Sequence, residues 1–463
     1  MLRVILPDSF ESERKYILRV LLREFLGLEY YLCIDKSMHG VVKIVAEDGA
    51  LTIVDVFFSD EKKWLSIESL PKFPLRKISV GNFFSDYKGE DELPVLYGVD
   101  TDRNFIEIDG NGIFLGLDIF GSAFFMLSRY EECVVLERDD YGRFTARSSV
   151  AYKAEFLERP IVNEYVELLW CVLQRVSRGL NRKKRYYKVI PTHDIDKPFG
   201  MMYDSKQQII RHFAGDVLYR KSLNAVVTRI KEVYRTLFNS KSVIAERKKT
   251  FTFICEQSEK YGLQDVFFFM NSKSSWLDGN YYVDEPEVLV LIKELRQANH
   301  MIGLHPSFVS YNNKKEMGKE VSFMNRVLRD NGLPILVGAR QHYLRWENPT
   351  TWQLYEEQGI PFDSTLSFAD YAGFRCGTCY EYPVYDVMNR RELNLWEYPL
   401  IVMDGTLYEY MKMERIAAME YTVHLAEKCK RYKGNFVLLW HNTSLDDVAE
   451  QELYAELLRR ICN

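Results

Sequence analysis

The chain has 463 residues, of which 47% are hydrophobic and 27% are charged, and its formal net charge is −5. This length exceeds that of one ordinary compact domain, and the near-balanced charge argues against a nucleic-acid-binding protein. No uncharged apolar run is long enough for a membrane span. The first apolar run is too short for a secretory signal, so we expect a cytoplasmic protein with eight reduced cysteines.

The N-terminal part mixes helical and strand patterns and carries no recognisable chemical motif. The pattern predicts helices at 11–26, 113–132 and 155–178 and strands at 41–46 and 51–58. Ser9 or Ser12 is the expected N-cap of the first helix. A basic run at 178–185 then breaks the pattern. We therefore predict a smaller α/β or α+β domain of unknown role over residues 1–183.

Short apolar strands and helical segments alternate over residues 184–463. The predicted strands lie at 187–192, 266–270, 301–305, 335–340, 360–363, 396–402 and 436–441. The main predicted helices lie at 287–298, 319–330, 351–358 and 413–430. This alternation predicts a parallel α/β barrel with seven strands. A helical insertion at 200–250 carries eleven Lys/Arg against four Asp/Glu; it is either a solvated face or a lid over an anionic substrate, and the solvated face is favoured.

Polar residues recur where the predicted strands end. Asp194 and Asp196 follow the first strand, and side chains two apart on an extended segment point the same way. Later strands end in His305 and Ser307, in Arg340, His342 and Tyr343, in Asp363, and in Trp440 and His441. Loops at the carboxyl ends of barrel strands converge on one mouth, so we expect these side chains to lie together. Glu397 is a further residue that could reach this mouth.

Aspartate and histidine side chains form a ligand set suited to Zn²⁺ or a similar divalent ion. Such an ion polarises a carbonyl group and lowers the pKa of bound water. The Asp-x-Asp spacing allows Asp196 to bind metal while Asp194 stays free as a base, held ionised by Arg340. Structural interpretations remain open: the carboxylates could cap a loop, and His441 could donate to a backbone carbonyl.

At these residues the chain resembles the polysaccharide deacetylase family (carbohydrate esterase family 4), whose barrel is NodB-like. The matching segments, within roughly residues 186–445, are Thr192–Asp196, His305–Val309, Arg340–Tyr343, loosely Asp363–Ser364, and Leu439–His441. The resemblance implies a deformed (β/α)7 barrel. It also implies Asp194 as general base, Asp196 and His305 as metal ligands, Arg340 as orienting residue, the Tyr343 N–H as oxyanion donor and His441 as general acid.

Two positions depart from the family pattern. Val309 stands where the second motif has its second metal-binding histidine, and His342 stands where the third motif has proline. His342 is therefore either the third ligand or a hydrogen-bonding partner of the substrate, and water could complete the metal shell. His193 is a poorer ligand because strand alternation turns it away from Asp196. The candidate substrate-binding residues are His193, Ser307, Asp363, Glu397 and Trp440.

These patterns predict a metal-dependent hydrolase that removes acetyl from an N-acetylated sugar or glycan intermediate, with Zn²⁺ as the expected metal. One alternative keeps the fold and changes the bond, to another amide or an O-acetyl ester. A second alternative is a non-catalytic relative that binds glycans. The expected partner is a carbohydrate, with no nucleic acid and no membrane span, and the sequence does not predict the oligomeric state.

Overall fold

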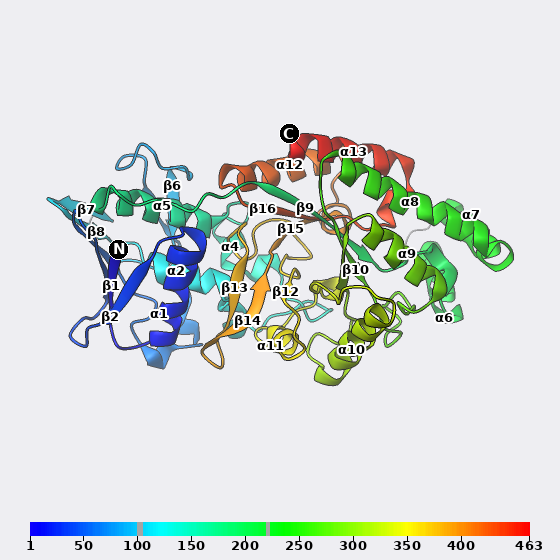
Figure 1. Ribbon diagram of the computed structural model, residues 1–463, viewed down its shortest axis with the longest axis horizontal. Coiled ribbons are helices and arrows are strands. Elements are labelled where there is room, and N and C mark those ends of the chain that lie inside the picture. The colour runs from blue at the N-terminus through cyan, green and yellow to red at the C-terminus, as the bar shows by residue number, and fades with distance from the viewer. Residues whose placement is uncertain (100–104, 219–222) are drawn as a thin grey trace.

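The structure is a computed structural model that describes residues 1–99, 105–218 and 223–463. The chain is mixed α/β (Figure 1). A six-stranded sheet lies near the N-terminus, and a five-stranded and a three-stranded sheet, bridged through Ala339, lie in the remainder. Among the described residues, no helix combines the length and the apolar character that crossing a membrane requires.

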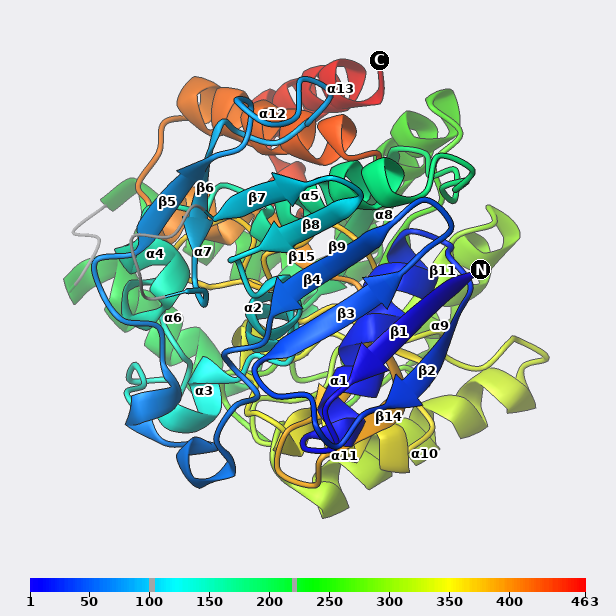
Figure 2. The ribbon, with the colours of Figure 1, turned by 90° about the vertical axis from the view of Figure 1, so that its left-hand side faces the viewer.

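The N-terminal sheet has the order β2-β1-β3-β4-β8-β7 and faces the viewer in Figure 2. Its strands are β1 (Leu2–Leu6), β2 (Tyr30–Ile34), β3 (Val41–Val45), β4 (Ala50–Val54), β7 (Ile106–Asp109) and β8 (Gly112–Leu115). A separate hairpin pairs β5 (Arg76–Ser79) with β6 (Glu92–Val95). The helices of this part are α1 (Glu11–Leu18), α2 (Ile119–Leu127), α3 (Glu131–Val134), α4 (Val150–Lys153) and α5 (Ile161–Val176). Helices α1 and α2 lie between the sheet and the rest of the molecule.

The predicted hairpin at 41–46 and 51–58 is confirmed as antiparallel β3 and β4, although β4 ends at Val54. The helix predicted at 113–132 is wrong in its first part, because Gly112–Leu115 pairs with β4 and β7 as a strand. Helix α2 begins only after Asp118, whose carboxylate accepts a hydrogen bond from the Gly121 N–H as an N-cap. Neither expected serine caps α1, which follows Phe10 in a left-handed conformation.

The second part contains a parallel sheet in the order β11-β10-β9-β16-β15. Its strands are β9 (Lys188–Ile195), β10 (Val266–Phe269), β11 (Met301–Leu304), β15 (Leu400–Met403) and β16 (Asn435–Leu439). A second sheet holds β12 (Phe362–Asp363), β13 (Tyr382–Asp386) and β14 (Arg391–Glu397). Ala339 joins the two sheets through single parallel bridges to Leu304 and Asp363. Among the described residues no ladder joins β15 to β13 or β14.

Most of the strands predicted in this part are confirmed, with two differences. The strand expected at 335–340 is reduced to the Ala339 bridge. The strand expected at 396–402 is two strands, because β14 ends at Glu397 and β15 starts at Leu400, on either side of Tyr398-Pro399. The antiparallel strand β13 was not predicted.

Helices flank the strands as expected. They are α9 (Pro286–Gln297), α10 (Lys314–Asp330), α11 (Thr350–Glu357), α12 (Arg415–Arg431) and α13 (Val448–Cys462). The insertion at 200–250 is helical, as predicted, and forms α6 (Lys206–Leu218), α7 (Leu223–Phe238) and the start of α8 (Ser240–Lys260).

A buried ionic network joins the N-terminal region to the second part. Arg375 donates two hydrogen bonds to the Glu132 carboxylate, at 3.0 and 2.6 Å, and Arg129 donates a third at 2.8 Å. Burial alone would raise the pKa of Glu132, but the two guanidinium groups outweigh it and lower that pKa. A buried charge needs such pairing, so this network fixes the loop around Arg375 against α3.

Candidate functional site

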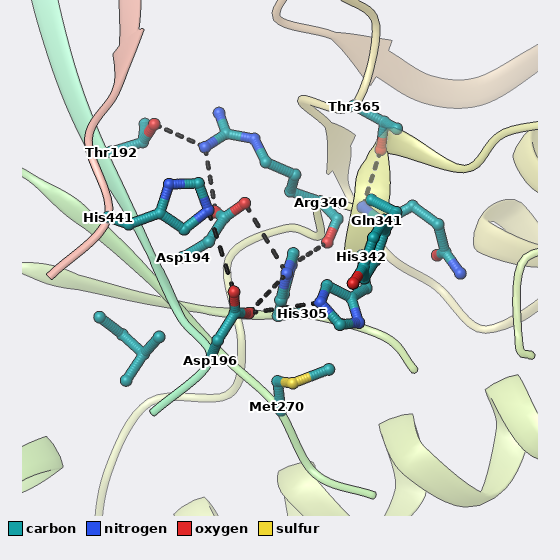
Figure 3. Close-up of polar contacts among 12 residues, drawn as sticks. Thr192, Asp194, Asp196, Met270, His305, Arg340, Gln341, His342, Thr365 and His441 are labelled. Carbon is teal, nitrogen blue, oxygen red and sulfur yellow. Dashed lines mark hydrogen bonds and ion pairs between the residues drawn. The ribbon is translucent and has the colours of Figure 1, made fainter. Parts of the chain in front are cut away.

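The carboxyl ends of the parallel strands border a cleft of about 360 Å³. Six of the sequence-predicted residues line it: Asp194, Asp196, His305, His342, Tyr343 and His441. They come from the ends of β9, β11 and β16 and from the loop after Ala339, so the same edge of the sheet carries all of them. Figure 3 labels Asp194, Asp196, His305, His342 and His441. The structure therefore brings the predicted catalytic and ligand positions together.

Asp196, His305 and His342 form a cluster that could hold a metal ion. The Asp196 Oδ1 atom lies 3.3 Å from His305 Nε2 and 3.6 Å from His342 Nε2. One ligand atom from each residue lies within 4.8 Å of the others, the only such group of three or more found in the described chain. His342 thus occupies the third position that Val309 does not supply.

Hydrogen bonds orient both imidazoles of this cluster. His305 Nδ1–H donates to the Arg340 carbonyl at 2.6 Å, and His342 Nδ1–H donates to the Asp278 carboxylate at 3.1 Å. Both Nε2 atoms therefore point toward Asp196, whose buried Oδ1 accepts no hydrogen bond within the described residues. Three convergent electron-pair donors fit a divalent cation of the Zn²⁺ type.

Asp194 lies beside this cluster and is held by a buried arginine. The guanidinium of Arg340 donates to Asp194 Oδ1 at 3.2 Å and to Thr192 Oγ1 at 2.6 Å. Its other nitrogens donate to the carbonyl and hydroxyl oxygens of Ser364 at 2.8 and 2.9 Å. The second carboxylate oxygen of Asp194 lies 3.7 Å from His305 Nε2. Asp194 is therefore an oriented carboxylate next to the Asp196–His305–His342 cluster, as a general base requires.

His441 lies beside Asp196, with its Nε2 atom 3.9 Å from Asp196 Oδ2. Its Nδ1–H donates to Asp404 Oδ1 at 2.6 Å, and its backbone N–H donates to Asp404 Oδ2 at 3.0 Å. Burial lowers the pKa of His441, but the Asp404 carboxylate, together with Asp196 and Asp194, outweighs burial and raises it to about 10. His441 is therefore protonated at neutral pH and can act as an acid.

Tyr343 lies in a strained turn at the rim of the cleft. Tyr343 and Leu344 have φ values of 62° and 53°, in the left-handed region that side chains other than glycine seldom adopt. Arg143, from the N-terminal region, donates to the Tyr343 carbonyl at 3.1 Å, and the Tyr141 ring stacks on the Tyr343 ring at 5.3 Å. Asp139 pairs with Arg143 at 2.7 Å. These contacts hold the turn that contains Tyr343 at the rim of the cleft.

The five predicted substrate-binding residues do not line the cleft. They are buried elsewhere: His193, Ser307, Asp363, Glu397 and Trp440. Strand alternation turns His193 to the outer face of the sheet, where it hydrogen-bonds the Trp440 carbonyl at 2.6 Å. Ser307 hydrogen-bonds Glu320, Trp352 donates to Asp363 at 3.1 Å, and the Leu366 N–H donates to Glu397 at 3.3 Å. These contacts place the five side chains among buried partners outside the cleft.

Three residues of the site were missed from the sequence: Asp278, Asp404 and Arg143. Asp404 directly follows β15, so the strand-end pattern that identified the other residues could have found it. Asp278 belongs to a long connection after β10, and Arg143 belongs to a segment without any motif. No local signal marks either residue, because only tertiary packing brings them to the cleft.

One family model matches the N-terminal part of the chain, and several solved structures are similar to parts of it. The model of a "Family of unknown function (DUF7033)" matches residues 2–178, and no curated protein matches the chain. A "putative polysaccharide deacetylase" from Mycobacterium smegmatis is 15% identical, with a TM-score of 0.39, over 60% of this chain and 85% of its own. A family 4 carbohydrate esterase from Streptomyces lividans, in complex with acetate, is 12% identical, with a TM-score of 0.27, over 46% and 79%.

A third similar structure is a mutant of a family 4 pseudoenzyme with restored enzymatic activity. It is 11% identical, with a TM-score of 0.30, over 60% of this chain and 63% of its own. All three TM-scores are below 0.5.

Replacing Arg143 by alanine tests whether the N-terminal region holds the Tyr343 turn. We expect amide exchange in the peptide spanning 341–346 to become about tenfold faster, because a hydrogen bond from a charged donor is lost. Hydrogen–deuterium exchange with mass spectrometry measures this change. Arg147→Ala, at an exposed position of the same segment, is the matched control. Unchanged exchange at 341–346 in Arg143→Ala would contradict this role.

Proposed function

We propose that the protein is a metal-dependent hydrolase that removes acetyl from an N-acetylated sugar or glycan intermediate. The observation that carries this proposal is the convergence of three kinds of group on one cleft. Asp194, held by Arg340, lies 3.7 Å from His305 of the Asp196–His305–His342 cluster, and His441, held by Asp404, lies 3.9 Å from Asp196 of the same cluster. An amide hydrolase needs a base, an electrophilic centre and an acid within reach of one substrate.

Each side chain has a distinct role in the proposed reaction. Zn²⁺ held by Asp196, His305 and His342 would supply a Lewis acid that polarises the acetamide carbonyl and makes water more acidic. Asp194, oriented by Arg340, accepts a proton from the attacking water. The Tyr343 N–H, which makes no backbone hydrogen bond within the described chain, donates to the carbonyl oxygen as negative charge develops.

His441 completes the reaction by donating its Nε2 proton to the amine nitrogen as the C–N bond breaks. Asp404 keeps the imidazole charged before this step and fixes its orientation. The products are acetate and a free amino sugar. Asp194 therefore takes its proton from water with Arg340 as its charged partner. His441 gives its proton to the amine nitrogen with Asp404 as its charged partner.

The proposal extends to the fold, the N-terminal region and the location of the protein. The row of parallel strands, bridged through Ala339, is compatible with a deformed seven-stranded barrel of the NodB-like type. The N-terminal domain, expected over residues 1–183, supplies Arg143 to the rim of the cleft. We also propose a cytoplasmic location and a substrate that is an intermediate of surface-glycan assembly.

Acetate release from N-acetyl and O-acetyl sugars tests the proposed activity. We expect zinc-supplemented wild-type protein to release acetate from N-acetylated sugars, and Asp194→Asn to be slower by at least about 100-fold, because the general base is lost. Asp284→Asn, at an exposed aspartate, is the control. Acetate release from O-acetyl esters alone would show that the bond hydrolysed is an ester and not an amide. Binding of glycans without any acetate release would favour the non-catalytic alternative.

Replacing Asp404 by asparagine tests the proton donor through the pH dependence of kcat/KM. The acid must be protonated, so activity falls as pH rises through the pKa of His441, which Asp404, Asp196 and Asp194 together raise to about 10. Without the Asp404 carboxylate that pKa falls, so the basic limb of the profile moves to lower pH by at least about one unit. A basic limb at the same pH in wild type and Asp404→Asn would exclude His441 as the donor.

A further inference from the structure

Helix α7 exposes an unusual number of large apolar side chains. Val227, Ile230, Tyr234, Leu237 and Phe238 have exposed fractions of 48%, 53%, 63%, 72% and 73%. Their spacing places them within about 100° of one face of the helix, as a continuous apolar stripe. A contiguous exposed apolar surface of this kind marks an interaction site more often than an accident of composition.

Basic residues accompany the stripe. Residues 200–250 carry eleven Lys/Arg against four Asp/Glu, whereas the whole chain has 61 against 66. The exposed side chains of Lys231 and Arg235 lie along one border of the stripe by their helical spacing, and Lys241 is exposed just beyond the helix. Arg235 also pairs with Glu246, so the charge is partly balanced within the insertion. The insertion therefore combines an apolar face with a net positive border.

The position of α7 leaves this face accessible. Helix α7 packs on α6, on α8 and on the turn at Gly200–Tyr203. Figure 1 shows α7 at the end of the molecule farthest from the N-terminal sheet. A surface at the tip of the molecule can contact a large flat partner without obstruction from the rest of the chain.

We propose that the stripe on α7 docks the protein on an anionic lipid bilayer, with the helix lying in the plane of the interface. Aliphatic and aromatic side chains insert at the acyl boundary while lysines and arginines meet acidic headgroups, which is the pattern of interfacial helices. A second copy meeting this face would bring two basic segments together, and a nucleic acid would leave the apolar stripe unburied. The charge thus favours a lipid surface.

Vesicle flotation of the full chain tests this proposal. We expect wild-type protein to float with vesicles that contain phosphatidylglycerol and to remain unbound with phosphatidylcholine alone. The combined variant Ile230→Glu and Leu237→Glu should lower the bound fraction at least about tenfold. The matched control carries Ile416→Glu and Val448→Glu, exposed by 72% and 66% on α12 and at the start of α13. Circular dichroism verifies that both variants are folded.

A charge variant gives an independent measurement. Lys231→Gln combined with Lys241→Gln should weaken binding to anionic vesicles, and added salt should weaken it in the wild type, because headgroup attraction is screened. No flotation of the wild type with anionic vesicles would overturn the proposal. Light scattering that shows a dimer in the wild type, lost in the Ile230/Leu237 variant, would also overturn it and assign the stripe to self-association.

Discussion

The buried guanidinium of Arg340 is the constraint on which the site depends. It donates to residues of β9 and to Ser364 beyond β12, and its own carbonyl orients His305. A fully buried arginine is tolerated only when its nitrogens find acceptors, so the strand ends must lie where these acceptors are. The same residue therefore fixes the candidate base, one candidate ligand and the meeting point of the two sheets.

The other two imidazoles follow the same rule with different partners. Asp278 holds Nδ1 of His342, and Asp404 holds Nδ1 of His441. In each case an acceptor on the far side of the ring turns Nε2 toward the cleft, which directs the nitrogens of His342 and His441 toward Asp196. The N-terminal region contributes through Arg143 and Tyr141, which hold the strained Tyr343 turn.

The sequence predicted the centre of the site because carboxyl ends of parallel strands share one edge, and this geometry needs no long-range information. The sequence also placed Asp363 and Glu397 at the cleft, where the structure does not put them. A position at the end of a strand does not determine whether the side chain faces the cleft or the buried interior. The prediction was also wrong at 335–340, where a single bridge replaces a strand. Asp278 and Arg143 reach the cleft by tertiary packing alone, which local patterns do not encode.

The most direct test of this account is the metal content of the purified full chain after zinc supplementation and dialysis, measured by inductively coupled plasma mass spectrometry. The comparison is between wild type, His342→Ala and His39→Ala, which removes an exposed histidine outside the site. The account predicts near-stoichiometric metal in the wild type and in His39→Ala, and loss of that metal in His342→Ala. Full retention of metal in His342→Ala, or no metal in the wild type, would contradict it.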